Sequence, residues 1–175
     1  MMKLKLERPS PALKQAFLSF TEDWARNGEE ITPYGFRLLG RSYEEWLSDA
    51  ARMETEAPAG FVPAHCFCLT GGTGTMLGAI QIRHRLNDAL LRTGGHIGYG
   101  VRPSERRKGY AEAMLALALP RAKRLGIERV LITCAKENAA SARTILHCGG
   151  VLENEIPEEG RVTQRYWIDL SRLPR

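Results

Sequence analysis

The sequence lacks any long hydrophobic run. No apolar stretch among the 175 residues approaches the length of about eighteen that a membrane-spanning helix needs. Residues 1–9 alternate leucine with charged side chains and contain no apolar core of the kind that marks a signal peptide. We therefore expect a cytoplasmic protein with no membrane partner.

Cysteine is also scarce, and the four cysteines do not form the pattern of a disulfide framework. Cys66 and Cys68 fall on a predicted strand, where their thiols would point to one face. A metal site with Cys134 and Cys148 is conceivable. However, the spacing matches no zinc pattern, and free cysteines are commonly buried, so we expect no metal.

Internal repeats, low-complexity tracts and breaks in composition are absent. The chain is 43% hydrophobic and 26% charged, which are ordinary globular values, so we expect one domain over residues 1–175 with a sizeable core. The net charge of +5 has two explanations, a solvated basic face or an anionic ligand. No basic patch is interleaved with several aromatic residues, so we expect no nucleic-acid partner.

Hydrophobic periodicity and turn residues predict an alternation of helices and strands. Ser10 and Ser42 are expected helix N-caps, and the apolar run 130–132 predicts a strand buried on both faces, parallel to the one at 96–101. In the last helix Ile145 and Leu146 are expected to face inward. The predicted helices cover about 11–27, 42–53, 109–125 and 138–148, and the predicted strands cover 3–7, 65–70, 75–84, 96–101, 129–135, 151–156 and 161–170.

The segment 96–111 contains the strongest local signal. An apolar strand leads into a turn that carries Pro103 and several basic residues, and Gly109 then opens a helix. This order of elements aims backbone N–H groups at an anion. A basic loop without a ligand is the alternative, but positive charge at a helix N-terminus opposes the helix dipole. The segment therefore predicts a phosphate-binding turn.

Residues 106–111, Arg-Arg-Lys-Gly-Tyr-Ala, fit the R/Q-x-x-G-x-G/A signature of the GNAT superfamily of acyl-CoA-dependent N-acyltransferases, which the chain resembles. Val101-Arg102-Pro103 precedes the signature at the usual distance, and residues 138–141 with Gly149-Gly150 resemble the second half of the cofactor site. More narrowly, residues 83–87, 94–99 and 165–168 resemble a bacterial branch of predicted acetyltransferases without an assigned substrate.

The resemblance covers nearly the whole chain and implies an α/β (α+β) fold. We expect a mixed, mostly antiparallel sheet of six or seven strands, about four flanking helices, and splayed parallel strands four and five. It also implies that acetyl-CoA is the cofactor. Backbone N–H groups and basic side chains of the signature would hold its phosphates, and the expected contacts are Arg106, Arg107, Lys108, Gly109, Tyr110 and Ala111.

The resemblance places the pantetheine arm between strands four and five. A bulge in strand four, at Tyr99, Gly100 and Val101, would aim a backbone N–H at the thioester carbonyl and stabilise the oxyanion. Further cofactor contacts are expected at the end of strand five and on the following helix. These are Cys134, Asn138, which can also be a plain N-cap, and Ser141.

An acceptor amine must lose a proton, and a lysine-like amine with a pKa of about 10.4 is almost fully protonated at neutral pH. Many relatives use a glutamate at the position that is Gly95 here, so the neighbouring His96 is the candidate base. The alternative is a structural histidine closing a strand end. The tyrosine acid of the family corresponds to Ile145, which cannot donate a proton, so Tyr99, Tyr166 or water would serve.

These features predict an N-acetyltransferase that moves the acetyl group of acetyl-CoA to a primary amine by direct attack in a ternary complex. The amine would belong to a small molecule or a peptide, and the protein would be a monomer or homodimer. A non-catalytic acyl-CoA-binding or sensor protein is the alternative, because position 145 lacks the tyrosine. A nucleic-acid-associated module is favoured only by net charge.

The acceptor pocket is expected to involve the loop between the first two helices and the end of the third strand. Its candidate residues are Tyr34, Phe36, Arg83, His84 and Asn87, although a packed strand-end role is the alternative for His84. Acidic residues of the first two helices could form a rim that suits a cationic amine, but such charges are more often mere solvation.

Overall fold

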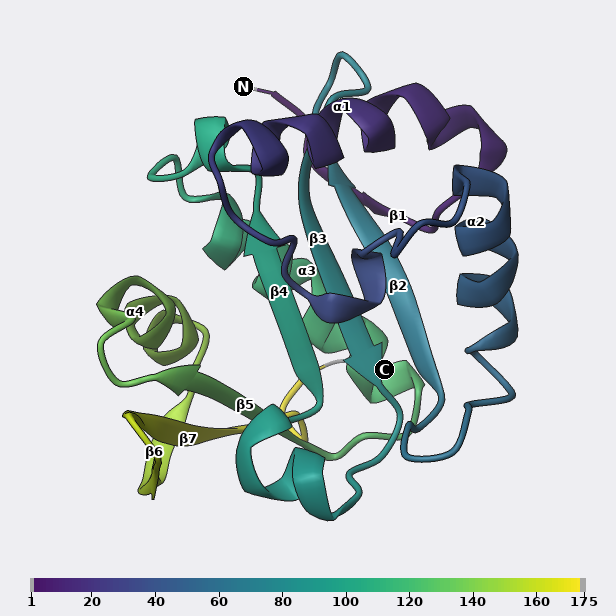
Figure 1. The fold of residues 1–175 in the computed structure, drawn as a ribbon. Helices are drawn as coiled ribbons and strands as arrows, with labels where there is room; N and C mark the ends of the chain where they lie inside the picture. The colour runs from purple at the N-terminus through teal and green to yellow at the C-terminus, as the bar shows by residue number, and fades with distance from the viewer. Residues whose placement is uncertain (1, 174–175) are drawn as a thin grey trace.

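A computed structural model describes residues 2–173, and Figure 1 shows their fold. Within that range the chain forms seven strands and four α-helices. Short helical turns lie at Pro11–Leu13, Tyr34–Phe36, Leu90–Gly94 and Pro103–Glu105. The strands are β1 (Lys5–Glu7), β2 (Ala64–Thr70), β3 (Met76–Arg83), β4 (Ile97–Val101), β5 (Arg129–Ala135), β6 (Val151–Glu158) and β7 (Arg161–Asp169); the helices are α1 (Lys14–Arg26), α2 (Tyr43–Arg52), α3 (Tyr110–Arg124) and α4 (Ala139–His147).

The α/β architecture is confirmed, but the strands do not form one continuous sheet. One antiparallel sheet has the order β1-β2-β3-β4, and the other has the order β5-β7-β6. Among the described residues no ladder joins β4 to β5. The two strands meet only at one end, where the His96 N–H donates to the Leu131 carbonyl at 2.7 Å. In Figure 1 they then diverge, as the splay of strands four and five predicts.

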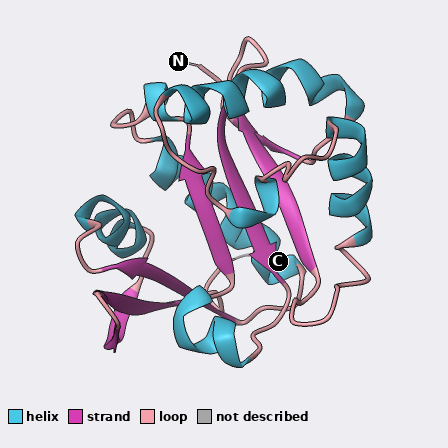
Figure 2. Ribbon diagram, viewed as in Figure 1, coloured by secondary structure: helices cyan, strands magenta, loops and turns pink. Residues whose placement is uncertain are grey.

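Helices cover both faces of the larger sheet. Helices α1 and α2 lie on one face and α3 lies behind the other (Figures 1 and 2). Strands β2 and β3 are buried almost throughout, because apolar side chains of both faces are covered. Cys66 and Cys68 point toward α1 and α2 within one apolar cluster, as free thiols. The described residues contain no group of three side chains that could hold a metal ion.

A second apolar cluster lies on the α3 side and connects the two sheets. It combines Ile80 of β3 and Leu115 of α3 with Ile132 of β5 and Ile168 of β7. The hydrophobic contacts therefore continue across the point at which the backbone ladder stops. None of the helices within residues 2–173 is long and apolar enough to cross a membrane.

Local sequence signals predicted most of the caps, turns and buried faces, and three expectations were not met. The Ser42 hydroxyl and the Glu45 carboxylate form a reciprocal capping box at the start of α2, whereas the Ser10 side chain makes no capping hydrogen bond. Leu146 was expected to face inward, but it is 49% exposed, because the buried stripe of α4 includes only Ile145. The last hairpin is also tighter than expected, since β6 continues through Pro157.

The capping box provides a test of how α2 is stabilised. Ser42→Ala should lower the free energy of unfolding by about 1 kcal/mol, because it leaves the Glu45 N–H without its acceptor. Ser10→Ala is the matched control and should change it by only a few tenths, since its hydroxyl caps nothing. Urea titration measures both values. Equal losses in the two variants would contradict the assignment.

Candidate functional site

On the edge of β4 that faces β5, the N–H groups of Tyr99 and Val101 have no hydrogen-bond partner among the described residues, whereas the Val101 carbonyl accepts from Arg106 Nε at 3.4 Å. Arg83 N–H donates to the His96 carbonyl at 2.7 Å and Arg102 N–H to the Leu77 carbonyl at 2.8 Å, which fixes the ladder between β3 and β4. Hydrogen-bonding direction alternates along a strand. Residues 98 and 100 therefore bond to β3, while the N–H and C=O groups of Tyr99 and Val101 point away from it, toward the diverging β5.

The expected bulge at Tyr99, Gly100 and Val101 is not present. The register with β3 runs without a shift from Gly78↔Val101 to Ile82↔Ile97. The divergence arises instead because β5 pairs with β7 and leaves the edge of β4. Gly100 is needed for another reason, since a Cβ there would lie 2.2 Å from the Thr32 carbonyl oxygen of the segment that crosses β4.

The turn before α3 has the backbone shape of an anion-binding nest. Arg107 and Gly109 both have left-handed conformations, with φ values of 62° and 81°. Within the described chain the N–H groups of residues 107–111 have no hydrogen-bond partner. They lie at the start of a 15-residue helix, and nothing lies within 4 Å of the position that a Cβ on Gly109 would occupy. This arrangement suits a phosphate group.

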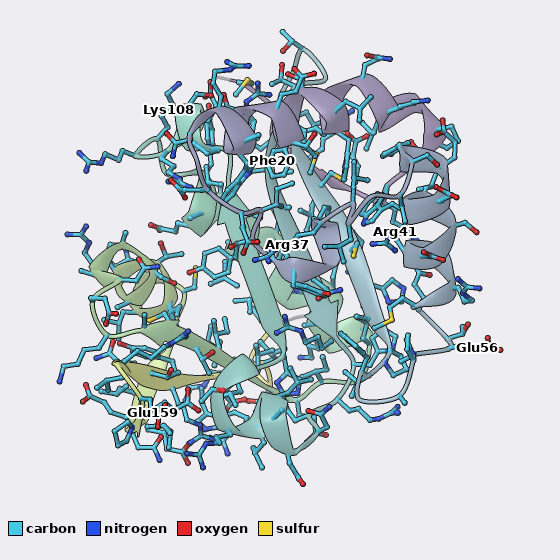
Figure 3. All side chains as sticks on the ribbon, viewed as in Figure 1. Phe20, Arg37, Arg41, Glu56, Lys108 and Glu159 are labelled. Carbon is cyan, nitrogen blue, oxygen red and sulfur yellow. The ribbon has the colours of Figure 1, made fainter. Side chains whose placement is uncertain are left out.

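The basic side chains of this turn are engaged to different degrees. Arg106 makes a two-pronged ion pair with Glu29, at 2.8 and 2.9 Å, and its hydrogen bonds lower the pKa of that carboxyl. Lys108 lies at the molecular edge in Figure 3 and pairs with Glu105 at 2.8 Å. Arg107 has no ion pair within the described residues. The free backbone groups and Arg107 are therefore the groups directly available to an anion.

Sequence reasoning missed the buried carboxylate that anchors the turn. Asp23 of α1 is only 6% exposed, accepts the Ser104 N–H at 2.9 Å, and lies 3.6 Å from Arg102. Burial by itself would raise the pKa of Asp23, but the Ser104 hydrogen bonds and the Arg102 charge lower it. The available signal was its position on the apolar stripe of α1, between Phe20 and Trp24.

Four predicted cofactor residues lie together between β4, β5 and α4. The Tyr99 hydroxyl lies 2.8 Å from Ser141 Oγ, and burial raises the pKa of Tyr99 to about 12. Cys134 is 8% exposed, and burial raises the pKa of its thiol as well. The Asn138 side chain accepts the Ser141 N–H at 3.1 Å, so it caps α4. Both Tyr99 and Cys134 are protonated at neutral pH.

The contacts of His96 favour the structural alternative over the role of base. The ring is 7% exposed, and its Nδ1 accepts the Leu131 N–H at 2.9 Å. Burial, together with the nearby Arg83 charge, lowers the pKa of His96 to about 4. The neutral ring therefore carries its proton on Nε2 and has no free lone pair. Gly95 has no side chain that could act as a base. A glutamate would not fit at this position, since a Cβ there would lie 2.7 Å from the Leu131 carbonyl oxygen.

The three positions considered for the general acid differ in their surroundings. Ile145 is fully buried in the core, where Gly150 packs so closely that an added Cβ would lie 2.5 Å from Ile145 Cγ2. Tyr166 is 3% exposed, and its hydroxyl donates to Gln164 at 2.7 Å. Of the two tyrosines considered as the acid, Tyr99 therefore remains the better candidate, because it lies on β4 and the Tyr166 hydroxyl already donates to Gln164.

A cavity of about 630 Å³ lies between α2, the loop at 56–62 and the end of β3. Tyr34, Arg83 and Asn87, three of the candidate acceptor residues, line it. The prediction for Phe36 is wrong, because its side chain is fully buried among the aromatic rings of α1 and α2. His84 is not a lining residue and instead lies 2.7 Å from a ring nitrogen of His65, which matches the packed alternative.

The carboxylates near the first two helices do not form an open acidic rim. Glu29 pairs with Arg106, Glu30 with Arg37, and Glu44 with Lys14. Asp23 is buried, and Glu45 belongs to the capping box. These charges are used mainly within the protein.

Comparison with known proteins establishes the family. The acetyltransferase (GNAT) domain family matches residues 3–151, and the chain belongs to this family. A comparison with curated protein sequences gives no match. Solved structures with the same fold include yncA from Salmonella typhimurium, a candidate acetyltransferase determined with its cofactor acetyl-CoA. It is 16% identical, with a TM-score of 0.67, over 99% of this chain and 96% of that one.

Two further structures from Vibrio cholerae are similar over almost their whole length. A spermidine N-acetyltransferase SpeG chimera with hSSAT is 17% identical, with a TM-score of 0.68, over 97% of this chain and 96% of that chain. A candidate ribosomal-protein-serine acetyltransferase is 16% identical, with a TM-score of 0.67, over 95% and 94%. At these identities the likeness establishes the fold.

The buried His96 predicts a specific pH dependence of stability. Its folded pKa lies below the unfolded value of about 6.5, so it favours folding above pH 6.5, and this contribution is lost as the pH falls toward 4. From pH 7 to pH 5 it should account for a loss of about 2 kcal/mol in the free energy of unfolding.

The measurement is urea unfolding at both pH values. His96→Asn, whose side-chain oxygen can still accept the Leu131 N–H, should lose about 2 kcal/mol less than the wild type over this interval. The exposed His147 provides the control, and His147→Asn should keep the wild-type difference. An unchanged pH difference in His96→Asn would contradict the assignment.

Proposed function

We propose that this protein is an N-acetyltransferase that transfers the acetyl group of acetyl-CoA to a primary amine. The observation that carries the proposal is the succession, along residues 99–111, of an open strand edge and a turn of unpaired N–H groups at a helix start. Membership of the GNAT family supports it, as does the yncA structure, which was determined with acetyl-CoA.

Each part of this segment has a distinct task in the proposal. The N–H groups of residues 107–111 and the Arg107 side chain bind phosphate. The amides of Tyr99 and Val101 receive the pantetheine arm, and one of them donates to the thioester oxygen as negative charge develops there. Acetyl-CoA supplies an acetyl group that is already activated as a thioester. The acceptor nitrogen forms the new bond to it directly, in a ternary complex.

The proton transfers are assigned from the hydrogen bonds already described. Tyr99 keeps its proton at neutral pH, so its hydroxyl can donate to the departing sulfur. The Nδ1 atom of His96 is occupied by Leu131, which leaves His96 as a positioning residue at the junction of the two sheets. We assign removal of the amine proton to water at the open edge of β4.

A non-catalytic acyl-CoA sensor is the second candidate. Ile145 in the position of the family's tyrosine and Gly95 in the position of its glutamate favour this alternative. Release of thiol during incubation with a broad amine library distinguishes the two, since a sensor would bind acetyl-CoA without consuming it.

The acceptor does not carry over from the structural neighbours. Their names point to spermidine in one case and to a ribosomal protein in another, so this fold accommodates different acceptors. We propose an amine of a small molecule or a peptide. We also propose that residues 1–175 form one acyltransferase domain, because one apolar cluster connects both sheets, and that the protein is a monomer or a homodimer.

The phosphate-binding turn can be tested by charge reversal at a free side chain. Arg107→Glu should raise the Kd for acetyl-CoA at least tenfold, because it places a negative charge beside the proposed phosphate site. Arg124→Glu makes the same change at the exposed opposite end of α3 and should shift the Kd less than twofold. Isothermal titration calorimetry measures both. Equal affinities for the two variants would contradict the assignment.

Direct transfer predicts that no cysteine is acetylated. Cys134 lies beside Tyr99 and Ser141 in the gap between β4 and β5, and its raised pKa makes it a poor nucleophile at neutral pH. Cys134→Ala should therefore retain at least half of the wild-type kcat once an acceptor is supplied. Complete loss of turnover, together with an acetylated Cys134 in the intact mass of wild-type protein, would require a covalent intermediate.

A further inference from the structure

Arg83 is a half-buried cation that lacks a carboxylate partner. Its Nη1 donates to the carbonyl oxygens of Gly94 and Gly95 at 2.9 and 3.1 Å. No carboxylate among the described residues lies within ion-pair distance of its guanidinium. Burial lowers the pKa of Arg83, since the charged form is partly desolvated. A buried charge of this kind is stabilised by an anion, and the chain itself supplies none.

The same guanidinium lies against the strand that carries the proposed acyl site. A Cβ at Gly98 would lie 3.1 Å from Arg83 Nη2 and 3.0 Å from Pro33 Cβ. Gly98 thus gives Arg83 room to pack on the face of β4, one residue before Tyr99. Because Arg83 also lines the 630 Å³ cavity, it lies between that cavity and the open edge of β4.

The other two cations of the cavity wall share one carboxylate. Arg41 pairs with Asp49 at 2.7 Å and donates to two backbone carbonyls, and Arg52 pairs with the same carboxylate. Arg41 lies beside α2 in Figure 3, whereas Glu56 lies at the outer edge of the molecule. Among the described lining cations Arg83 is therefore the one without a carboxylate partner, which favours it as the group that binds an anion from a ligand.

An aromatic pair also lines the cavity. The rings of Tyr34 and Phe61 stack with centroids 6.5 Å apart, and both side chains are about half exposed, at 51% and 53%. Val62 and Leu90 extend this apolar wall. The cavity therefore combines an anion-binding group close to β4 with an apolar wall.

We propose that the acceptor is an amine that also bears a carboxylate, such as an amino acid, and that its carboxylate binds Arg83 while its apolar side chain packs on Tyr34 and Phe61. This inference rests on the proposed acetyl transfer and assigns the acceptor class for the same site. The carboxylate binds through charge-assisted hydrogen bonds, which position the neighbouring amine toward Tyr99. A polycationic amine has no anion to offer Arg83.

The first experiment uses the wild-type protein and matched acceptors. Thiol release is measured with the common α-amino acids, with their amides, with the corresponding decarboxylated amines, and with spermidine. We expect turnover of at least one amino acid, with kcat/KM about 10- to 100-fold above that of its amide. Equal use of acid and amide, preference for polyamines, or no turnover of any amino acid would overturn the inference.

The second experiment changes the arginine itself. Arg83→Lys keeps the charge but loses the planar, two-pronged geometry, so KM for the preferred amino acid should rise at least tenfold and the preference over the amide should shrink. Arg85→Lys makes the same change at an exposed position two residues away and should shift KM less than twofold. An unchanged KM in Arg83→Lys would contradict the assignment.

Two further measurements separate the possible failures. Because Arg83 also holds the carbonyls of Gly94 and Gly95, the melting temperature of each variant is recorded; if Arg83→Lys does not fold, the comparison of acid and amide on the wild type still decides. Acetyl-CoA binding by wild-type protein is measured in parallel. Absence of that binding would contradict the proposed function, whereas binding accompanied by polyamine turnover would overturn only the acceptor class.

Discussion

The structure depends on the way one residue joins two sheets. His96 satisfies both backbone groups of Leu131, donating its own N–H to the carbonyl and accepting the Leu131 N–H on its ring. A ladder of paired strands would normally continue from such a contact. Here the ring takes the place of the next backbone partner, and Gly95 supplies the left-handed bend that brings the ring there. Beyond this point the edges of β4 and β5 are free to diverge.

The phosphate-binding turn depends in turn on a polar anchor in α1. Backbone N–H groups without a partner do not stabilise the conformation of the turn. The turn also includes the strained backbone of Arg107, so other contacts must hold it. The Asp23 carboxylate and the Ser19 hydroxyl bind Ser104 and Arg102, so that α1 fixes the entry to the turn from outside. Two segments about eighty residues apart in the chain therefore hold the backbone N–H donors of the turn in place.

Local patterns predicted what local physics determines. Periodicity and caps placed every strand and α-helix to within a few residues, and the glycine and basic residues of the turn indicated an anion site. Contacts between distant segments were not predictable in this way. Tyr34 and Phe36 are both aromatic and share one loop, yet only Phe36 enters the core, because the packing of α1 against α2 decides which ring is enclosed. The hydrogen bond from the Leu131 N–H to the His96 ring also joins distant segments, so the division into two sheets could not be predicted from local patterns either.

The anchor at Asp23 also has a consequence for local unfolding. Helix α1 covers the sheet through an apolar face, but its polar link to the turn is made by a few side chains near its C-terminal half. Any opening of α1 that breaks this link releases the turn from the conformation that binds phosphate. By thermodynamic reciprocity, a phosphate ligand in the turn suppresses that opening. The amides of α1 should thus report on ligand binding through their hydrogen exchange, although α1 need not touch the ligand.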